Sequence, residues 1–363
     1  MNLQISFRNT VEPLNSILSN SFDKSSLTPY EMIVVKIIQG WHTTAPELVL
    51  STSGSTGLTK EVIINKEEAV LSAKRTIEYF SLKQGDAALL CIDCRFVGGF
   101  MMIVRSIVAG MNMIVMEPTA NPLTSLKPDQ YPSFIALVPL QLASSLKILN
   151  KKDHKTSNLK GIIVGGAPID SAILKAVRAI DEPIYQTFGM TETISHIALR
   201  KISGKDHSDV YTLLPGIMIK SDKEKRLLIN LGEGEWINTN DIVEILEKGN
   251  FKWLGRIDNV INSGGVKINP EVIESEIGTV LKEIGFEGRH FAAGMSDPKL
   301  SEKVVLVVEG EISDDAKESL LLILKKRLPR YYSPKEVICF EKFIETENGK
   351  IKRQDTLKYY LNR

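Results

Sequence analysis

The apolar positions in the first half of the chain alternate between short continuous runs and stripes with helical spacing. From Asn65 onward, apolar residues recur every three or four positions as far as Phe80, which predicts an amphipathic helix. The continuous runs are typical of strands buried on both faces, and they lie at residues 47–51, 62–64, 87–92, 134–138 and 161–164. Repeated alternation of strand and helix predicts an α/β fold with a mostly parallel sheet that helices cover on both faces.

The pattern changes beyond about residue 205, where the apolar runs become short and closely spaced. Runs at 227–231, 242–246 and 251–254 predict a small antiparallel β region. From residue 257 two helices, three strands and a polar tail predict a compact α+β domain, whose first helix begins at Asn269-Pro270. We therefore expect a large domain over residues 1–256 and a small C-terminal domain over residues 257–363.

The most apolar stretch of the chain, Phe96–Met116, predicts a buried helix followed by a buried strand. Arg105 and Asn112 interrupt it, so a membrane span is disfavoured. With 363 residues, 43% hydrophobic and 25% charged, the composition is that of a globular protein. A formal net charge of +1 provides no field that would attract nucleic acid or an anionic membrane. The N-terminus shows no signal-peptide pattern, so we expect a cytoplasmic protein.

The three cysteines are too few for a disulfide framework. Cys91 and Cys94 form a CxxC pair, which suits a redox or zinc site only in the right structural context. The surrounding sequence shows neither a thioredoxin-like unit nor two further metal ligands. We therefore expect two half-buried cysteines without a chemical role.

A loop rich in glycine and hydroxyl residues, STSGSTGLTK at 51–60, carries the strongest chemical signal. Its glycines allow backbone N–H groups to approach an anion, and Lys60 adds positive charge, which suits a polyphosphate. It is not a Walker P-loop, because Lys60 lies between Thr59 and Glu61. A surface linker is the alternative, and the flanking predicted strands disfavour it.

Other segments suit a ligand but would be ordinary turns if each stood alone. Gly165 and Gly166 follow a predicted strand, where α/β sheets place their ligands. Glu192, among hydroxyl residues, is a candidate ligand for a hard cation such as Mg²⁺. The segments are YQTFGMTET at 185–193, GGAP at 165–168, WINTND at 236–241, GRID at 255–258 with SGG at 263–265, and TENGKIKR at 346–353.

Together and in this order, these motifs resemble those of the adenylate-forming superfamily of acyl- and aryl-CoA ligases, peptide-synthetase adenylation domains and luciferases. The resemblance extends from about residue 45 to the C-terminus. Within the superfamily, the segments 99–105, 138–142 and 189–193 resemble most the o-succinylbenzoate–CoA ligases of menaquinone biosynthesis. The resemblance implies ATP, Mg²⁺ and coenzyme A as cofactors, and a small carboxylate that is first adenylated and then transferred to the CoA thiol.

The resemblance also implies roles for individual residues. Thr191 contacts the α-phosphate, Glu192 holds Mg²⁺, and Lys350 bridges the attacking carboxylate and the phosphate. Asp241 binds the ribose hydroxyls, with Arg256 nearby. The β- and γ-phosphates fall to Thr52, Ser53, Gly54, Ser55, Thr56, Gly57 and Lys60. The adenine and acyl pockets are assigned to Gly165, Gly166, Ala167, Phe188 and Gly189.

The same resemblance makes Asp258 a hinge about which the small domain turns after adenylation, withdrawing Lys350. Gly264 and Gly265 would then line a tunnel for the pantetheine arm of CoA. Candidates for the acyl pocket are Phe96, Gly98, Gly99, Val138, Pro139, Phe188, Ser195 and His196. A second, distal carboxylate on the acid would need a donor or cation, for which Ser195, His196 and Arg105 are candidates. For His196 a plain core role is equally open, and for Arg105 we favour a structural role.

The chain departs from the superfamily pattern in several places. Typical members have a longer N-terminal region. Thr59 stands where Pro is usual, Glu61 and Asn240 where Gly is usual, and Phe188 where Tyr is usual. None of these differences removes a charged group with an implied role.

Alternatives remain open at this stage. The acid could be another aryl or acyl carboxylate, or the acceptor a carrier-protein thiol. A catalytically silent, nucleotide-binding homologue is a different class, which the retained Lys350 disfavours. A dehydrogenase is disfavoured because no GxGxxG follows a predicted strand. A shortened N-terminal region would leave part of a sheet exposed, so a homodimer is a further expectation.

Overall fold

The computed structural model describes residues 3–53, 59–150, 158–232, 234–345 and 351–361. Contacts among these residues form two compact units. The first comprises the described residues up to Met218 together with Leu231–Gly234, and the second comprises Ile219–Asn230 and the chain from Glu235 onward. We expected the small domain to begin at residue 257 because it would turn about Asp258. Contacts within one arrangement of the chain do not test such a movement, so this boundary stays a prediction.

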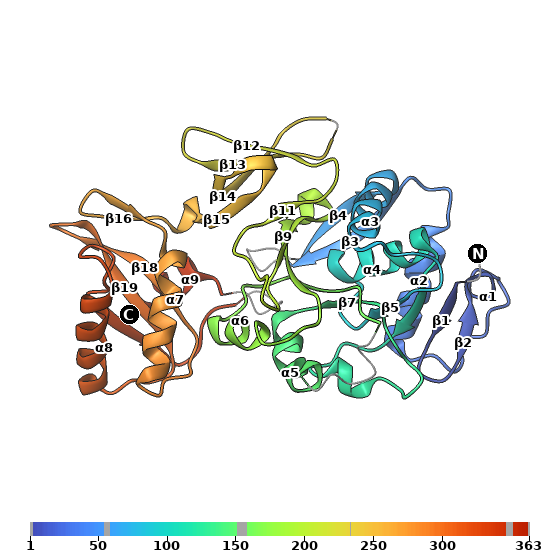
Figure 1. Ribbon diagram of the computed structural model, residues 1–363, viewed down its shortest axis with the longest axis horizontal. Helices are drawn as coiled ribbons and strands as arrows, with labels where there is room; N and C mark the ends of the chain where they lie inside the picture. The colour runs from blue at the N-terminus through green and yellow to red at the C-terminus, as the bar shows by residue number, and fades with distance from the viewer. Residues whose placement is uncertain (1–2, 54–58, 151–157, 233, 346–350, 362–363) are drawn as a thin grey trace. The chain divides into compact units, whose positions relative to one another are not determined.

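The first unit is built on a sheet with strand order β11-β10-β9-β8-β7-β5-β6-β1-β2 (Figure 1). The six neighbours from β9 to β1 run parallel, whereas β2, β10 and β11 pair antiparallel at the two sides. The strands are β1 (Gln4–Ser6), β2 (Val11–Pro13), β5 (Ala87–Leu90), β6 (Asn112–Val115), β7 (Phe134–Leu137), β8 (Gly161–Val164), β9 (Ile184–Met190), β10 (Ser195–Lys201) and β11 (Thr212–Leu213).

Helices bury both faces of the parallel strands, which explains their continuous apolar sequences. One set of alternate strand residues, including Leu89, Ile135 and Ile162, packs with α5 and α6. The helix α4 lies against β5, β6 and β7, and α3 packs beside α4. The bounds are α1 (Leu14–Ile17), α2 (Pro29–Trp41), α3 (Lys66–Phe80), α4 (Val97–Ala109), α5 (Pro139–Leu149) and α6 (Ser171–Val177). The predicted start of α3 is confirmed, because the Asn65 side chain accepts hydrogen bonds from the backbone N–H groups of Glu67 and Glu68.

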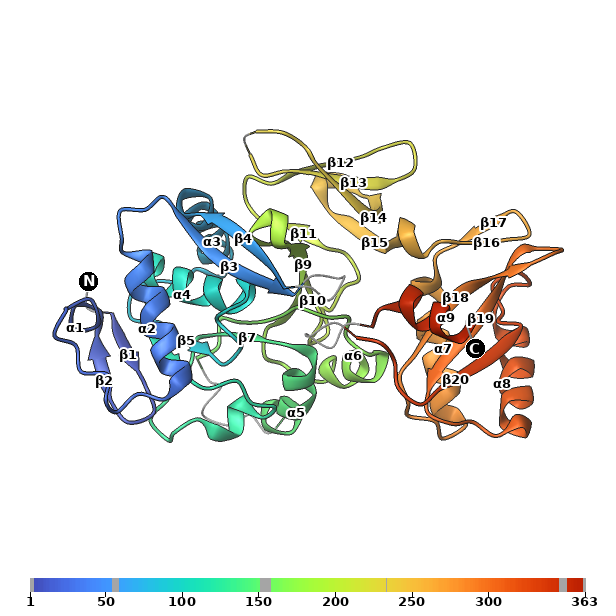
Figure 2. The same cartoon turned by 180° about the vertical axis from the view of Figure 1, so that it is seen from behind.

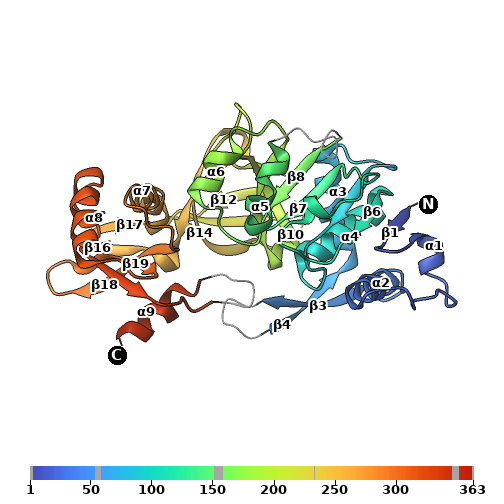
Figure 3. The ribbon, with the colours of Figure 1, turned by 90° about the horizontal axis from the view of Figure 1, so that it is seen from below.

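Two of the predicted strands do not join the parallel sheet. The strands β3 (Glu47–Ser53) and β4 (Thr59–Asn65) form a separate antiparallel hairpin, seen apart from the main sheet in Figure 3. The physical reason is connection length, because a parallel pair needs a crossover of a dozen or more residues and an antiparallel pair does not. The prediction of two strands is confirmed, and their pairing with each other was not predicted.

The second unit contains two smaller sheets. One has the order β12-β13-β14-β15, with β12 (Met218–Ser221), β13 (Arg226–Asn230), β14 (Ile237–Ile245) and β15 (Phe251–Arg256). It confirms the predicted small antiparallel region. The other has the order β17-β16-β19-β18 with β20 beside β19. Its strands are β16 (Ile261–Ser263), β17 (Val266–Ile268), β18 (His290–Asp297), β19 (Ser301–Glu309) and β20 (Glu336–Phe340).

Helices cover both faces of this second small sheet (Figure 2). The helices α7 (Pro270–Glu283) and α8 (Asp314–Arg327) pack against Ala292, Leu306 and Val308. Leu357 of α9 (Arg353–Leu361) packs against the opposite face, with Phe291 and Val307. We expected a polar tail after β20, and the structure shows that its last described part is a helix. Leu357, buried Thr356 and the Tyr360 ring against Phe340 anchor it, and this mixed set gives too weak an apolar periodicity for detection from sequence.

The cysteines of the CxxC pair are free and fully buried rather than half-buried. Burial raises the pKa of the Cys91 thiol to about 12 and that of Cys94 to about 11. Both thiols are therefore protonated at neutral pH and unreactive as nucleophiles. The expectation that they carry no chemistry remains the simplest interpretation of their surroundings.

The start of α4 presses closely on the turn before it, and this contact is testable. A Cβ atom on Gly99 would lie 2.4 Å from the carbonyl oxygen of Asp93, whereas one on Gly98 would lie 3.4 Å from the side chain of Ile92. We expect Gly99→Ala to lower the free energy of unfolding by about 1–3 kcal/mol, because backbone cannot move aside as a side chain can. Gly98→Ala is the matched control and should leave stability nearly unchanged. Thermal unfolding monitored by circular dichroism compares them, and equal stability of the two variants would contradict this close packing.

Candidate active site

The parallel strands of the first unit end at a common edge, and most predicted pocket residues follow them there. Neighbouring strands β5, β7, β8 and β9 run in the same direction, so the loops after them meet at one side. The residues that follow these strands or end them are Phe96, Gly98, Gly99, Val138, Pro139, Gly165, Gly166, Ala167, Phe188 and Gly189. The topology thus brings together segments that lie far apart in the sequence.

The loop after β8 lies close to β9. Thr187 donates a hydrogen bond to the Val164 carbonyl at 3.2 Å, and a Cβ on Gly165 would lie 2.4 Å from the Thr187 hydroxyl oxygen. Gly166 follows with φ +89°, a conformation that favours glycine. Phe188, the residue after Thr187 on β9, is half-buried, and its ring packs edge-on against the ring of Tyr211.

A tight turn after β9 presents Glu192 to solvent. Residues Thr191–Thr193 form a short 3₁₀ helix, and Ile194 and Ser195 both have positive φ. Buried Thr193 holds the turn, since its hydroxyl accepts from the Met190 N–H at 3.0 Å and lies 2.7 Å from the Ser195 carbonyl. Glu192, at the centre of the turn, is exposed. The strained backbone is thus stabilised by one buried side chain that the sequence analysis did not single out.

The turn fits the expected role of Glu192 with Mg²⁺. The described residues contain no cluster of three or more His, Cys, Asp or Glu side chains that could hold a metal ion. Mg²⁺ does not need one, because it keeps several waters and is commonly bound by one or two carboxylates together with phosphate oxygens. A single exposed carboxylate such as that of Glu192 is therefore a suitable donor for magnesium bound to a nucleotide.

A buried guanidinium lies in the middle of α4. Arg105 is 1% exposed and packs in a helix whose other residues are almost all apolar. Its Nη2 donates to Ser195 Oγ at 2.9 Å and lies 3.4 Å from His196 Nδ1, and its Nε has no hydrogen-bond partner. Among the described residues no carboxylate pairs with it. The cost of burying this charge is therefore not offset by a visible ion pair.

His196 completes this group on the β10 side. Arginine can only donate hydrogen bonds, so His196 Nδ1 accepts from Arg105 and the ring proton is on Nε2, which lies 3.2 Å from Thr76 Oγ1. Burial lowers the pKa of His196 well below its ordinary value, and the charge of Arg105 adds to this effect. Burial likewise lowers the pKa of Arg105 to about 9, so the arginine is the charged member at neutral pH. The structure places the three candidates for a distal carboxylate in one cluster.

In the second unit, Asp241 and Arg256 are directly opposite each other on β14 and β15. The indole N–H of Trp253 donates to Asp241 Oδ1 at 2.8 Å, and the backbone N–H of Asp241 donates to Thr239 Oγ1 at 3.1 Å. The bond from Trp253 orients the carboxylate and leaves lone pairs for further donors, and the bond to Thr239 fixes the backbone of Asp241. The predicted pair is thus adjacent, and Trp253 is a supporting residue that the sequence analysis missed.

The predicted hinge and glycine pair also lie in the second unit. Arg256 Nη2 donates to Asp258 Oδ2 at 2.7 Å. Gly264 has φ +60° and lies against the ring of Tyr331, where a Cβ would approach Tyr331 Cε1 to 2.8 Å. Gly265 also has positive φ and open space around it. A side chain at Gly264 is therefore excluded by packing as well as by backbone conformation.

Arg353, the first residue of α9, is bonded to α7. Arg353 forms two hydrogen bonds to Glu274, at 2.7 and 2.9 Å, and its Nη1 lies 3.7 Å from Glu271. Burial raises the pKa of Glu271, although Arg353 and Asn259 oppose this effect. The carboxylate of Glu271 lies over Gly255, where a Cβ would approach it to 2.6 Å. These contacts fix Arg353, the last residue of the TENGKIKR segment.

Several predictions fall outside what the structure describes. Gly54, Ser55, Thr56, Gly57 and Lys350 lie outside the described residues. Thr52, Ser53 and Lys60 lie in the paired strands β3 and β4, with Thr52 opposite Lys60. The roles of all these residues stay predictions.

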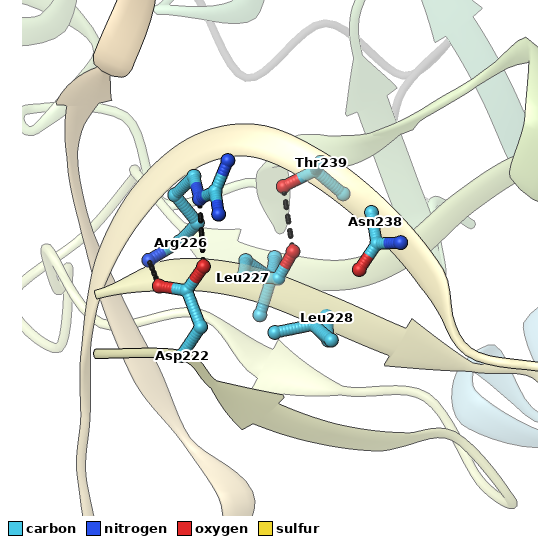
Figure 4. Close-up of a pocket in the computed structure, with 6 residues that line it drawn as sticks. All are labelled: Asp222, Arg226, Leu227, Leu228, Asn238 and Thr239. Carbon is cyan, nitrogen blue, oxygen red and sulfur yellow. Dashed lines mark hydrogen bonds and ion pairs between the residues drawn. The ribbon is translucent and has the colours of Figure 1, made fainter. Parts of the chain in front are cut away.

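A cavity of about 220 Å³ opens in the β12–β15 sheet (Figure 4). It lies where the pairing of β13 with β14 shifts register, between Arg226 and Leu228. An ion pair between Arg226 and Asp222 at 2.6 Å stands on one side of it. None of the predicted site residues lines this cavity, so its presence does not support the candidate site.

Comparison with known proteins identifies the class of molecule that this edge and these motifs define. The AMP-binding enzyme family matches residues 29–237, more than half of the chain. A solved acyl-CoA synthetase (AMP-forming)/AMP-acid ligase II-like protein from Dyadobacter fermentans is 35% identical, covers 92% of this chain and 95% of its own, and has a TM-score of 0.60. The chain belongs to the AMP-binding enzyme family, which confirms the resemblance and the predicted fold class.

More specific relatives point to one branch of the family. A 2-succinylbenzoate–CoA ligase from Listeria monocytogenes is 29% identical over 88% of this chain and 71% of its own length. One from Bacillus cereus is 26% identical over 85% of this chain and 68% of its own. The o-succinylbenzoate coenzyme A synthetase from Bacillus subtilis, solved with ATP and magnesium, is 20% identical, covers 85% of this chain and 69% of its own, and has a TM-score of 0.70. This last likeness shows the fold alone. No helix of the described part of the chain is long and apolar enough to cross a membrane.

The neutral state of His196 predicts how stability depends on pH. In the unfolded chain a histidine binds a proton below a pKa near 6.5, whereas folded His196 stays neutral. Unfolding therefore takes up a proton below about pH 6.5, and the free energy of unfolding falls there by up to about 1.4 kcal/mol per pH unit.

We expect His196→Gln to remove this part of the slope between pH 5 and 6.5 and to leave the slope above pH 7 unchanged. Urea unfolding at a series of pH values measures it. His207→Gln, at an exposed histidine, is the matched control. The same slope in His196→Gln as in the unmodified protein would show that His196 is not held neutral.

Proposed function

We propose that this chain is an ATP-dependent 2-succinylbenzoate–CoA ligase. In the first half-reaction a carboxylate oxygen of the acid attacks the α-phosphorus of ATP, forming an acyl-adenylate and releasing pyrophosphate. In the second, the CoA thiol attacks the acyl carbon, the bond from that carbon to the phosphate oxygen breaks, and AMP leaves. The observation that carries this assignment is the buried Arg105 cluster within a member of the AMP-binding enzyme family.

The Arg105 cluster suits an acid with a second carboxylate. A buried cation without an ion-pair partner is costly, and a ligand carboxylate would offset that cost with a charge-assisted hydrogen bond. Ser195, which Arg105 contacts, is only partly buried, so the cluster is reachable from one side. 2-Succinylbenzoate has such a distal carboxylate, and relatives of this chain are named for that acid.

The adenylation step needs charge stabilisation more than proton transfer. Negative charge develops on the phosphate oxygens, and fixed donors and cations stabilise it. Lys60 and the loop glycines hold the β- and γ-phosphates, Thr191 contacts the α-phosphate, and Asp241 orients the ribose. Glu192 would hold Mg²⁺, which would supply positive charge to the phosphate oxygens. Lys350 brings its ammonium group to the attacking carboxylate.

The second half-reaction requires Lys350 to withdraw from the acyl-adenylate. We propose that residues 257–363 turn about Asp258, so that Gly264 and Gly265 approach the adenylate and admit the pantetheine arm. The attacking species is the thiolate, which is a few per cent of a free thiol near pH 7. Cytoplasmic location and homodimer formation stay predictions, the latter measurable by light scattering after size exclusion.

The substrate assignment is tested by ATP–pyrophosphate exchange across a panel of acids. The panel contains 2-succinylbenzoate, benzoate, short and long fatty acids and amino acids, each with and without CoA. Exchange with 2-succinylbenzoate and formation of its CoA thioester are the expected results. Exchange with a different acid alone would retain the family chemistry and replace the substrate. ATP binding without exchange for any acid would instead support a silent homologue.

Arg105→Met tests the distal carboxylate directly. Methionine fills the apolar space without a charge, so stability should be maintained or increased. Exchange with 2-succinylbenzoate should fall about a hundredfold, while any residual exchange with benzoate should not change. Arg105→Lys, which keeps a positive charge, is the control and should retain part of the activity. A strongly destabilised Arg105→Met protein that loses activity equally toward all acids would indicate the structural role favoured from sequence.

Lys350→Ala separates the two half-reactions. We expect adenylate formation to fall by at least about a hundredfold, because a charge that acts in the transition state is removed. Thioester formation from preformed adenylate should remain, because the lysine is withdrawn in that step. Rapid-quench assays with ATP or with synthetic adenylate measure the two rates. Equal loss of both would contradict the assigned role.

A further inference from the structure

Asn240 occupies the position at which this chain departs from the superfamily's threonine-glycine-aspartate pattern. It lies on β14 directly before Asp241, and its side chain is exposed. Its amide nitrogen donates to both carboxylate oxygens of Asp258, at 3.0 Å and 3.2 Å. Glycine has no side chain and could not make either bond. The one unusual residue of this motif therefore reaches the one residue that the resemblance identifies as the hinge.

Asp258 is held from three directions. It lies in the short 3₁₀ helix η5 (Ile257–Asn259), which directly follows β15. Besides the two bonds from Asn240, its carboxylate accepts from Arg256 Nη2 at 2.7 Å. Its backbone carbonyl lies 3.5 Å from the side-chain amide nitrogen of Gln354 on α9. Strand β14, strand β15 and helix α9 thus all contact the same residue.

The bonds from Asn240 depend on the orientation of the hinge. The contact with Arg256 joins residues two apart on one segment, so it can follow a local rotation. The bonds from Asn240 span 18 residues and join two different elements of the unit. A change in φ and ψ of Asp258 would carry its carboxylate away from β14. These bonds therefore exist in one orientation of the hinge and not in another.

We propose that Asn240 is a positioning residue that latches the Asp258 hinge in the orientation seen here. The latch adds a free-energy difference between the two orientations and so sets the ratio of the two half-reaction rates. The proposal rests on the proposed function, which supplies the turn about Asp258. It adds a residue to that mechanism through a side chain in which this chain differs from the superfamily pattern.

The expected size of the effect is moderate. Asp258 and its partner Arg256 are each more than a third exposed, so water competes for these hydrogen bonds. Loss of a hydrogen bond to a partly exposed carboxylate changes an equilibrium by about three- to tenfold. We therefore expect a shift in the balance between two active states and not a loss of either activity.

The test compares Asn240→Ala with the matched control Asn238→Ala, an exposed asparagine on the same strand without a hydrogen bond to the hinge. Hydrogen–deuterium exchange of the free protein reports on amides 257–260. Exchange there should be about three- to tenfold faster in Asn240→Ala than in the control. Asn240→Asp, which places two carboxylates together, should accelerate it further.

The functional measurement is the ratio of single-turnover rates for adenylate formation and for thioester formation. In Asn240→Ala the two rates should move in opposite directions, changing their ratio about three- to tenfold. The same substitution made in an Asp258→Ala background should have no further effect, because the acceptor is gone. An unchanged ratio, an equal fall of both rates, or full additivity with Asp258→Ala would overturn the latch.

Failure of the latch can be distinguished from failure of the proposed function. The hydrogen-exchange measurement needs no substrate, so it remains informative if 2-succinylbenzoate is not the acid. A working ligase whose hinge exchange and rate ratio do not respond to Asn240→Ala would overturn the latch alone. Faster hinge exchange in a protein that forms no adenylate with any acid would keep the contact and overturn the ligase.

Discussion

The requirement that parallel strands be buried on both faces shapes the first unit of this protein. Strands β5, β7 and β8 have no polar face, so helices must cover both sides of the sheet. The only parts of these strands that can meet a ligand are then the loops at their ends. Because the strands share one direction, glycine-rich and aromatic segments from distant parts of the sequence converge at one edge. The proposed nucleotide and acid pockets follow from this constraint.

The polar side chains proposed to act in the two units differ in their exposure to water. Arg105 is held in an apolar helix and its charge is expensive, so an anionic ligand has a large effect on it. Asn240 and Asp258 lie at the surface, where water makes any single contact weak. The first situation suits recognition of one particular acid. The second suits a conformational balance, which must be reversible in every turnover and would be hindered by a strong bond.

Sequence alone could predict the elements that are determined by residues close together in the chain. The start of α3 at Asn65, the buried strands and the glycine-rich loops were visible because each depends on neighbours in the chain. The β3–β4 pairing was missed because it depends on connection geometry, and helix α9 because its buried side is a mixed set of Thr356, Leu357 and Tyr360. Contacts over long sequence distance were also invisible. Trp253 reaching Asp241, and Arg105 reaching Ser195 across 90 residues, leave no local pattern.

In the proposed adenylation step, a carboxylate oxygen of the acid becomes bonded to the α-phosphorus of ATP. An isotope-transfer experiment tests this bond directly. 2-Succinylbenzoate labelled with the heavy oxygen isotope in both carboxylates is incubated with the protein, ATP and CoA, and the masses of the products are measured by mass spectrometry. The proposed mechanism predicts AMP that carries one heavy oxygen from the acid, because the acyl carbon–oxygen bond breaks in the second half-reaction. Heavy oxygen in inorganic phosphate, or thioester formed with unlabelled AMP, would contradict it.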